Sequence, residues 1–87
     1  MSKVVAISGG FGCLGIAVGE AFAAHGWRVA LIDQASVPRP LADTARSEKL
    51  LIGAVDLTDL HMANCAMQQV QQHFQGLDAL INVAGGF

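Results

Sequence analysis

Short continuous runs of apolar residues alternate along the chain with longer stretches in which apolar positions recur every three or four residues. The continuous runs predict parallel β-strands buried on both faces, and the periodic stretches predict amphipathic helices between them. Strands are expected at residues 3–8, 27–33, 49–55 and 77–82. Helices are expected at residues 13–25 and 41–48 and from a capping residue at Thr58 to a stop at Gly76, with a proline-containing loop at residues 34–40.

The last predicted helix has the clearest division into an apolar and a polar face. Ala66, Val70 and Phe74 recur at four-residue intervals, and the glutamines between them point to the other side. In the first helix, Leu14 begins a similar apolar stripe that is expected to lie on the sheet. Because strands separated by crossover helices run parallel, the predicted fold class is α/β, a Rossmann-type doubly wound parallel sheet of four strands.

A glycine-rich turn, Ser-Gly-Gly-Phe-Gly-Cys-Leu-Gly at residues 8–15, joins the first strand to the first helix. Gly10, Gly12 and Gly15 fit the pattern G-x-G-x-x-G, in which a side chain would block a tight turn, the approach of a pyrophosphate or helix–strand packing. The backbone N–H groups at the helix start, together with the helix dipole, favour an anion there. A tight turn without a ligand is the alternative, and the acidic Asp33 eighteen residues past Gly15 argues against it.

The composition is that of a large protein's interior, with 53% hydrophobic and 14% charged residues in a chain of 87. We therefore expect residues 1–87 to be the N-terminal part of a single larger domain. The formal net charge of −2, without a cluster of Lys or Arg, argues against a nucleic-acid partner. No apolar run is long enough for a membrane span or a signal peptide, so we expect no membrane partner and a cytoplasmic location.

The cysteines and histidines have no spacing typical of a metal site or a disulfide framework. Cys13 is expected to be a small buried hydrophobe in the glycine turn, although a redox-sensitive thiol at a helix start is the alternative. His61 and His73 lie twelve residues apart on one predicted helix, with no partner spacing for a metal or a base. We interpret both as solvated helix residues.

Polar or glycine-rich segments follow all four predicted strands, and together they resemble the N-terminal part of the short-chain dehydrogenase/reductase family. The glycine turn is similar to the family's T-G-x-x-x-G-x-G, with Ser8 for the threonine and with Gly9 and Gly15 in place. Cys13 stands where the middle glycine is usual, and Gly12 supplies the same backbone freedom one position earlier. The resemblance covers the whole chain.

Two further segments carry the resemblance. Asp56-Leu57 is similar to the family's adenine-contacting D-[VL] pair, although an Asp two residues before Thr58 is also common turn chemistry. Residues 82–85, Asn-Val-Ala-Gly, resemble the family's N-N-A-G, in which small residues let the chain pass over the adenosine ribose. Val83 replaces the second Asn, so we expect the middle strands to be organised differently from those of most members.

The resemblance implies an oxidoreductase that transfers hydride between a nicotinamide cofactor and an alcohol or carbonyl substrate. The cofactor-binding residues that it implies are Ser8, Gly9, Gly10, Phe11, Gly12, Cys13, Leu14, Gly15, Asp33, Asp56, Leu57, Asn82, Ala84 and Gly85. A carboxylate at Asp33 accepts both ribose hydroxyls of NAD and repels the 2′-phosphate of NADP. The first base after it is Arg39, so NAD is the expected cofactor, with NADP the less favoured alternative.

Hydride transfer in the family relies on a Tyr-x-x-x-Lys pair and an upstream Ser, and this chain has no tyrosine. We therefore expect the first third of a reductase, without catalytic residues of its own and inactive alone, whose complete form is a homo-oligomer. The dihydropteridine reductase branch and the 3-oxoacyl reductases both remain open. Outside this function, a non-catalytic NAD-binding module is the main alternative, and a methyltransferase or flavin protein is less favoured.

Overall fold

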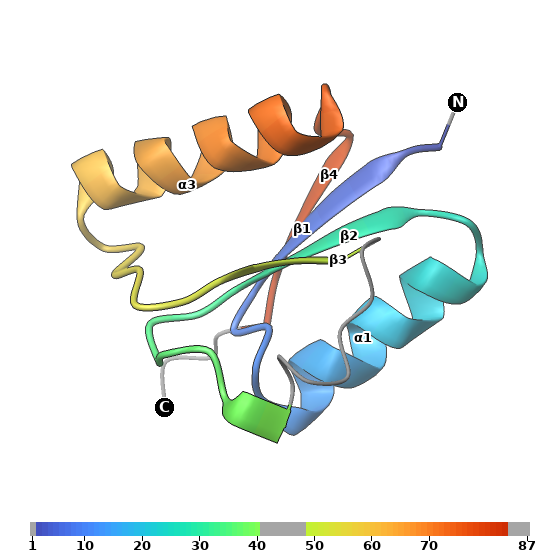
Figure 1. The fold of residues 1–87 in the computed structure, drawn as a ribbon, viewed down its shortest axis with the longest axis horizontal. Helices are drawn as coiled ribbons and strands as arrows, with labels where there is room; N and C mark the ends of the chain where they lie inside the picture. Colours follow the sequence, from blue (N-terminus) through green and yellow to red (C-terminus); the bar gives the residue numbers. More distant parts are fainter. Residues whose placement is uncertain (1, 41–48, 84–87) are drawn as a thin grey trace.

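A computed structural model describes residues 2–40 and 49–83. Within these residues four strands and two long helices follow the predicted order (Figure 1). They are β1 (Val4–Ser8), α1 (Cys13–Ala24), β2 (Arg28–Ile32), β3 (Lys49–Ile52), α3 (Leu60–Phe74) and β4 (Ala79–Asn82). The predicted helix at residues 41–48 and the site residues Ala84 and Gly85 lie outside the described residues. None of the helices in the described ranges has the length and hydropathy needed to cross a membrane.

The four strands form one sheet in the order β3-β2-β1-β4, and every neighbouring pair is parallel. The predicted α/β fold class is thus confirmed. The register places Ser8 beside Ile32 on one side and beside Asn82 on the other, so the carboxyl ends of β1, β2 and β4 lie level. The chain builds outward from β1 to β3 and then returns to add β4 on the other side of β1, which puts a topological switch point between β1 and β4.

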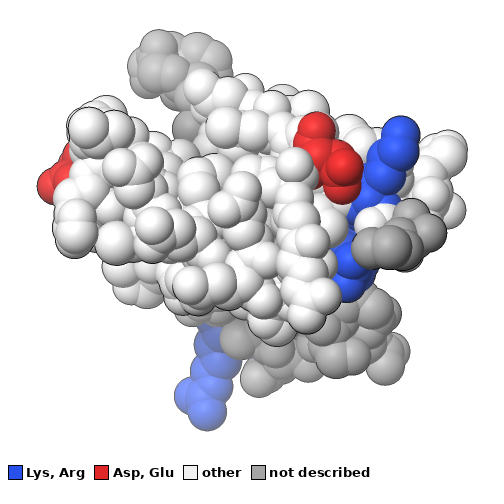
Figure 2. Space-filling view, turned by 90° about the horizontal axis from the view of Figure 1, so that it is seen from above, with Lys and Arg blue, Asp and Glu red and all other residues white. Residues whose placement is uncertain are grey.

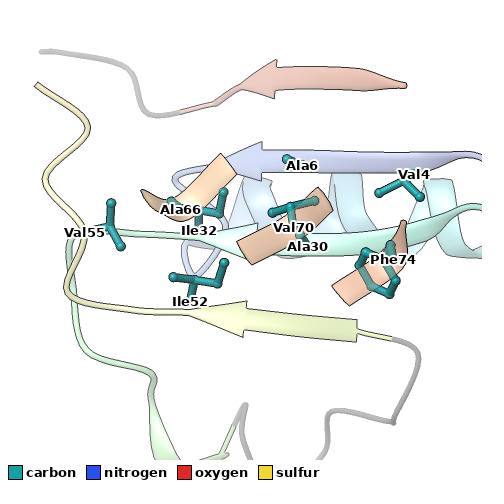
Figure 3. Close-up of a cluster of buried hydrophobic side chains, with 9 residues drawn as sticks. All are labelled: Val4, Ala6, Ala30, Ile32, Ile52, Val55, Ala66, Val70 and Phe74. Carbon is teal, nitrogen blue, oxygen red and sulfur yellow. The ribbon is translucent and has the colours of Figure 1, made fainter. Parts of the chain in front are cut away.

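The sheet lies between the two helices, with α3 on one face and α1 on the other (Figure 1). Side chains alternate along β1, so that Val4 and Ala6 face α3 while Val5 and Ile7 face the α1 side. Figure 3 shows the layer under α3, which contains residues of three strands together with Ala66, Val70 and Phe74 of the helix. The apolar face predicted for this helix is therefore confirmed.

Helix α1 packs on the sheet through its glycines together with Val18 and Phe22 of the predicted apolar stripe. Its buried residues are Gly15 and Gly19, and a Cβ on Gly19 would lie 3.1 Å from the side chain of Leu31. This close approach turns Leu14 outward, where it is 65% exposed, so its predicted position on the sheet was wrong. Cys13, the first residue of α1, is also exposed, which corrects the prediction of a buried hydrophobe.

The ends of the helices follow the usual capping preferences, but two of the predicted end residues of α3 were one position off. Gly26, with a φ of 84°, follows α1 as expected. The N-cap of α3 is Asp59, whose side chain accepts a hydrogen bond from the N–H of Met62, and Thr58 is not the cap. At the other end of α3 the left-handed residue is Gln75, with a φ of 60°, one position before the expected Gly76.

Candidate functional site

The carboxyl ends of β1 and β4 meet at the switch point of the sheet, which is where open α/β sheets bind ligands. The hydroxyl of Ser8, which is 3% exposed, donates to the side-chain carbonyl oxygen of Asn82 at 2.6 Å. The backbone N–H of Val83 donates to the carbonyl oxygen of Ser8 at 3.1 Å. The turn after β1 and the segment after β4 are therefore tied together, although 74 residues separate Ser8 from Asn82.

The glycine turn is packed too tightly for side chains at two of its positions. A Cβ on Gly15 would lie 2.2 Å from the carbonyl oxygen of Gly9, and a Cβ on Gly10 would lie 2.7 Å from the Cβ of Leu31. Gly9 itself has a φ of 68°, in the left-handed region that disfavours side chains. These three glycines shape the turn, whatever it binds.

Gly12 differs from the other glycines of the turn. Its φ of −77° suits any residue, and a Cβ there would meet only the carbonyl oxygen of Gly9, at 3.7 Å. Gly12 is also the N-cap of α1, with no side-chain hydrogen bond at the cap and no acidic residue in the first turn. The folded chain thus has no internal need for glycine at this position, and it leaves the amino end of α1 clear for a negatively charged ligand.

Asp33 follows β2 and reaches back to the glycine turn. Its Oδ2 accepts the backbone N–H of Phe11 at 3.0 Å, and its Oδ1 accepts the N–H of Ala35 at 3.1 Å. The backbone of Asp33 also pairs with the end of β3 and with the segment after it, through hydrogen bonds to Ile52 and Val55. The carboxylate is therefore fixed beside the turn, at the same edge of the sheet as Ser8.

Asp56 lies in the turn between β3 and α3. Its Oδ1 accepts both the N–H of Thr58, at 2.9 Å, and the hydroxyl of Thr58, at 2.6 Å. Both bonds lower the pKa of the Asp56 carboxyl, because both stabilise its charged form, and the bond from the hydroxyl has the larger effect. The turn chemistry considered for this pair is thus present. It leaves Oδ2 as the oxygen for any adenine contact.

Replacing Thr58 with Val is expected to raise the pKa of Asp56, because it removes the hydroxyl donor and keeps the backbone N–H. Because the pKa of Asp56 is lowered, its charged carboxylate stabilises the folded chain at pH values above the ordinary Asp pKa of 3.8. This stabilisation is lost as the pH falls through the folded-state pKa. An NMR titration of the Asp56 side chain measures the change, and Asp56→Asn identifies its resonance. An unchanged midpoint in Thr58→Val would contradict the assignment.

A mainly apolar, open hollow of about 410 Å³ lies beside this edge of the sheet. Its lining combines three of the predicted site residues with four others, namely Ser8, Leu57, Asn82, Thr58, Ala63, Met67 and Leu80. The hollow brings the Asp56-Leu57 segment into the same region as the ends of β1 and β4. All predicted site residues in the described part of the chain therefore gather at the carboxyl edge of the sheet.

Sequence reasoning missed two pairings. The hydrogen bond between Ser8 and Asn82 was signalled only by their places at the ends of two predicted strands. The second is on α3, where His61 is exposed, as expected of a solvated helix residue. Its Nε2 lies 3.7 Å from the Sγ of Cys65, four residues further along the helix, a contact that was not predicted. The signal was a histidine and a cysteine at i and i+4 on one helix.

Comparison with known proteins gives the family of the chain. The family model for short chain dehydrogenases matches residues 3–87. The chain belongs to the short-chain dehydrogenase family. The resemblance inferred from the four segments is thus confirmed, and the glycine turn, the end of β2 and the end of β4 are parts of a short-chain dehydrogenase fold.

Two curated short-chain dehydrogenases are similar in sequence. The L-2,3-butanediol dehydrogenase of Corynebacterium glutamicum is 30% identical over 98% of this chain and 35% of its own length. The 2-(R)-hydroxypropyl-CoM dehydrogenase of Xanthobacter autotrophicus is 32% identical over 98% of this chain and 36% of its own length. The chain thus spans little more than a third of these relatives.

Two solved structures share the fold and hold different nicotinamide cofactors. A short-chain dehydrogenase from Leptospira borgpetersenii with bound NAD⁺ is 25% identical, with a TM-score of 0.74 over 99% of this chain and 32% of its own. ElxO with bound NADP is 24% identical, with a TM-score of 0.84 over 99% of this chain and 36% of its own. These likenesses show that the chain shares its fold with both proteins.

Proposed function

We propose that this part of a short-chain dehydrogenase binds NAD(H) in preference to NADP(H). The observation that carries the proposal is the hydrogen bond between the Asp33 carboxylate and the N–H of Phe11. It holds a negative charge against the glycine turn just after the second strand, where the acidic residue of dinucleotide-binding folds contacts the adenosine ribose. A carboxylate held there accepts ribose hydroxyls and repels a 2′-phosphate.

The glycine turn and the start of α1 are proposed to hold the pyrophosphate. Gly12 leaves room for close approach, and the uncapped amino end of α1 offers N–H groups and a favourable dipole. Leu14 belongs to the same proposed set, because its 65% exposed side chain lies in the first turn of α1. Cys13, also exposed, lies beside it.

The adenine is proposed to contact Asp56 and Leu57. The Oδ1 of Asp56 is occupied by Thr58, so we assign Oδ2 as the acceptor for the exocyclic amine. Leu57 lies at the hollow that it shares with Ser8 and Asn82. The small residues Ala84 and Gly85, which follow β4 in the sequence, complete the proposed set.

The proposed reaction of the complete enzyme is hydride transfer to or from an alcohol or carbonyl substrate. When bound, the nicotinamide supplies the hydride chemistry, and the residues of this chain bind and orient the dinucleotide. The names of the two curated relatives, both dehydrogenases of small hydroxylated compounds, support this substrate class. The chain holds no tyrosine to act as the proton donor, so we assign it cofactor binding alone.

Titration with NADH and NADPH, followed by nicotinamide fluorescence, tests the cofactor preference. We expect the unmodified chain to bind NADH about 10- to 100-fold more tightly than NADPH, the value of one charge-assisted hydrogen bond. Asp33→Asn keeps an oxygen for the N–H of Phe11 but removes the charge, so it is expected to lose most of that preference. Tighter binding of NADPH by the unmodified chain would contradict the proposal.

Asp59→Asn is the matched control for Asp33→Asn. Asp59 is an exposed acid at the N-cap of α3 and belongs to none of the proposed cofactor contacts. Asn caps helices as well as Asp does, so this variant removes one negative charge without disturbing the helix. Its NADH preference is expected to equal that of the unmodified chain. An equal loss of preference in both variants would indicate a general effect of net charge.

A further inference from the structure

The outer face of α3 carries a histidine and a cysteine that the cofactor site does not use. His61 and Cys65 are both exposed and lie one helical turn apart, with the Nε2 of His61 3.7 Å from the Sγ of Cys65. Imidazole nitrogen and thiolate sulfur are the two ligand types that zinc and similar divalent ions prefer in proteins. Within the described residues they form a pair, without a third His, Cys, Asp or Glu close enough to make a larger group.

We propose that His61 and Cys65 form a two-ligand site for a zinc-type divalent cation on the outer face of α3. Zinc binds nitrogen at 2.0–2.1 Å and sulfur at about 2.3 Å, so tetrahedral ligands on one ion lie about 3.6 Å apart. The observed 3.7 Å between Nε2 and Sγ fits this separation. The spacing of the two atoms therefore matches that of two ligands on one ion, with water in the other positions.

The surroundings of the pair do not repel a cation. The fifteen residues of α3 include no Lys, Arg, Asp or Glu, so no positive side chain of the helix repels the ion. Figure 2, which looks onto the α3 side of the molecule, shows a broad central area without charged side chains. An exposed pair on such a surface is open to solvent and to exchange of the ion.

Binding exchanges a proton for the metal ion. The thiol of Cys65 loses its proton to solvent as the sulfur–metal bond forms, and the neutral ring of His61 donates the lone pair of Nε2 while its proton stays on Nδ1. No electron is transferred. One proton is thus released for each ion bound, which makes binding weaker at lower pH.

Titration of the full chain with Co²⁺, followed by the charge-transfer absorption of the cobalt–thiolate bond, tests the proposal. We expect one ion per chain, displaced by Zn²⁺. Cys65→Ser is expected to abolish the absorption, and His61→Ala is expected to weaken binding by about tenfold or more, because one of two linked ligands is lost. The chain offers matched controls, since Cys13→Ser and His73→Ala remove the same residue types elsewhere and are expected to change the affinity less than about twofold.

A relocated histidine separates the proposed geometry from a loss of fold. Gln69 is exposed and follows Cys65 by four residues, so the double variant His61→Ala, Gln69→His rebuilds the pair on the other side of the cysteine. It is expected to recover the affinity lost in His61→Ala. Absorption that persists in Cys65→Ser, or unchanged affinity in His61→Ala, would overturn the proposal. So would a failure of the relocated histidine in a variant whose circular dichroism shows an intact α3.

Discussion

Gly15→Ala is expected to lower the free energy of unfolding by about 3 kcal/mol or more, at the upper end of the cost of overpacking. The added Cβ would lie 2.2 Å from the carbonyl oxygen of Gly9 and 2.8 Å from the Cα of Gly10. Both are backbone atoms, so α1 or the glycine turn must move as a whole. Urea denaturation followed by circular dichroism measures the loss, and NADH binding is expected to be lost with it.

Gly12→Ala is the matched control, three residues away in the same turn. Its Cβ would meet only the carbonyl oxygen of Gly9 at 3.7 Å, so the cost in unfolding free energy is expected to stay below about 1 kcal/mol. Its affinity for NADH is nevertheless expected to fall by about tenfold or more, because the methyl group occupies the approach of the pyrophosphate. A Gly12→Ala chain that binds NADH normally would show that the pyrophosphate does not approach Gly12.

Phe74→Ala is expected to cost about 3–5 kcal/mol of unfolding free energy, the usual result of deleting a buried phenyl ring. Phe74 is 4% exposed and closes the core layer under α3 (Figure 3). Its ring also lies 5.3 Å from the guanidinium carbon of Arg28, so the variant removes a cation–π contact as well. Thermal or urea unfolding followed by circular dichroism measures the loss.

Gln72→Ala serves as the control for Phe74→Ala. Gln72 is exposed on the same helical turn, and alanine is a good helix former, so a change within about 0.5 kcal/mol is expected. If Phe74→Ala cost less than 1 kcal/mol while Gln72→Ala behaved as expected, α3 would not be anchored to the sheet through this ring. The two variants together therefore test the packing of α3 and not merely its helicity.

The strands could be predicted because a strand buried on both faces appears in the sequence as a continuous run of apolar residues. Such a run can be recognised without an alternating apolar and polar pattern. Val5 and Val29 are neighbours in the sheet and both are buried, as continuous runs suggest. The position of α1 could not be predicted in the same way. Sequence patterns weigh apolar side chains, whereas α1 approaches the sheet through Gly15 and Gly19, where a side chain is absent. This is why Leu14 was expected on the wrong side.

The loop chemistry was predictable in type but not in detail. Thr58 and Asp59 are both good N-cap residues, and neighbouring positions cannot be told apart by propensity. The structure separates them because Asp56 engages the hydroxyl of Thr58, which leaves Asp59 to accept the N–H of Met62. Asp33 was predictable as an acid after the second strand, but its bond to Phe11 depends on how closely the turn packs against β2.

Because β1 lies between β2 and β4, the two sides of the site form at different times during synthesis. Among the four strands β1 is synthesised before the others, so β2 can pair with it early, whereas Asn82 of β4 follows its partner Ser8 by 74 residues. Such long-range pairing is slow compared with local contacts, because loop closure must precede it. Until then one edge of β1 stays open and the hydroxyl of Ser8 lacks its acceptor. The nascent chain thus forms the glycine turn before it forms the opposite wall of the site, and this edge of β1 is open to mispairing until β4 is synthesised.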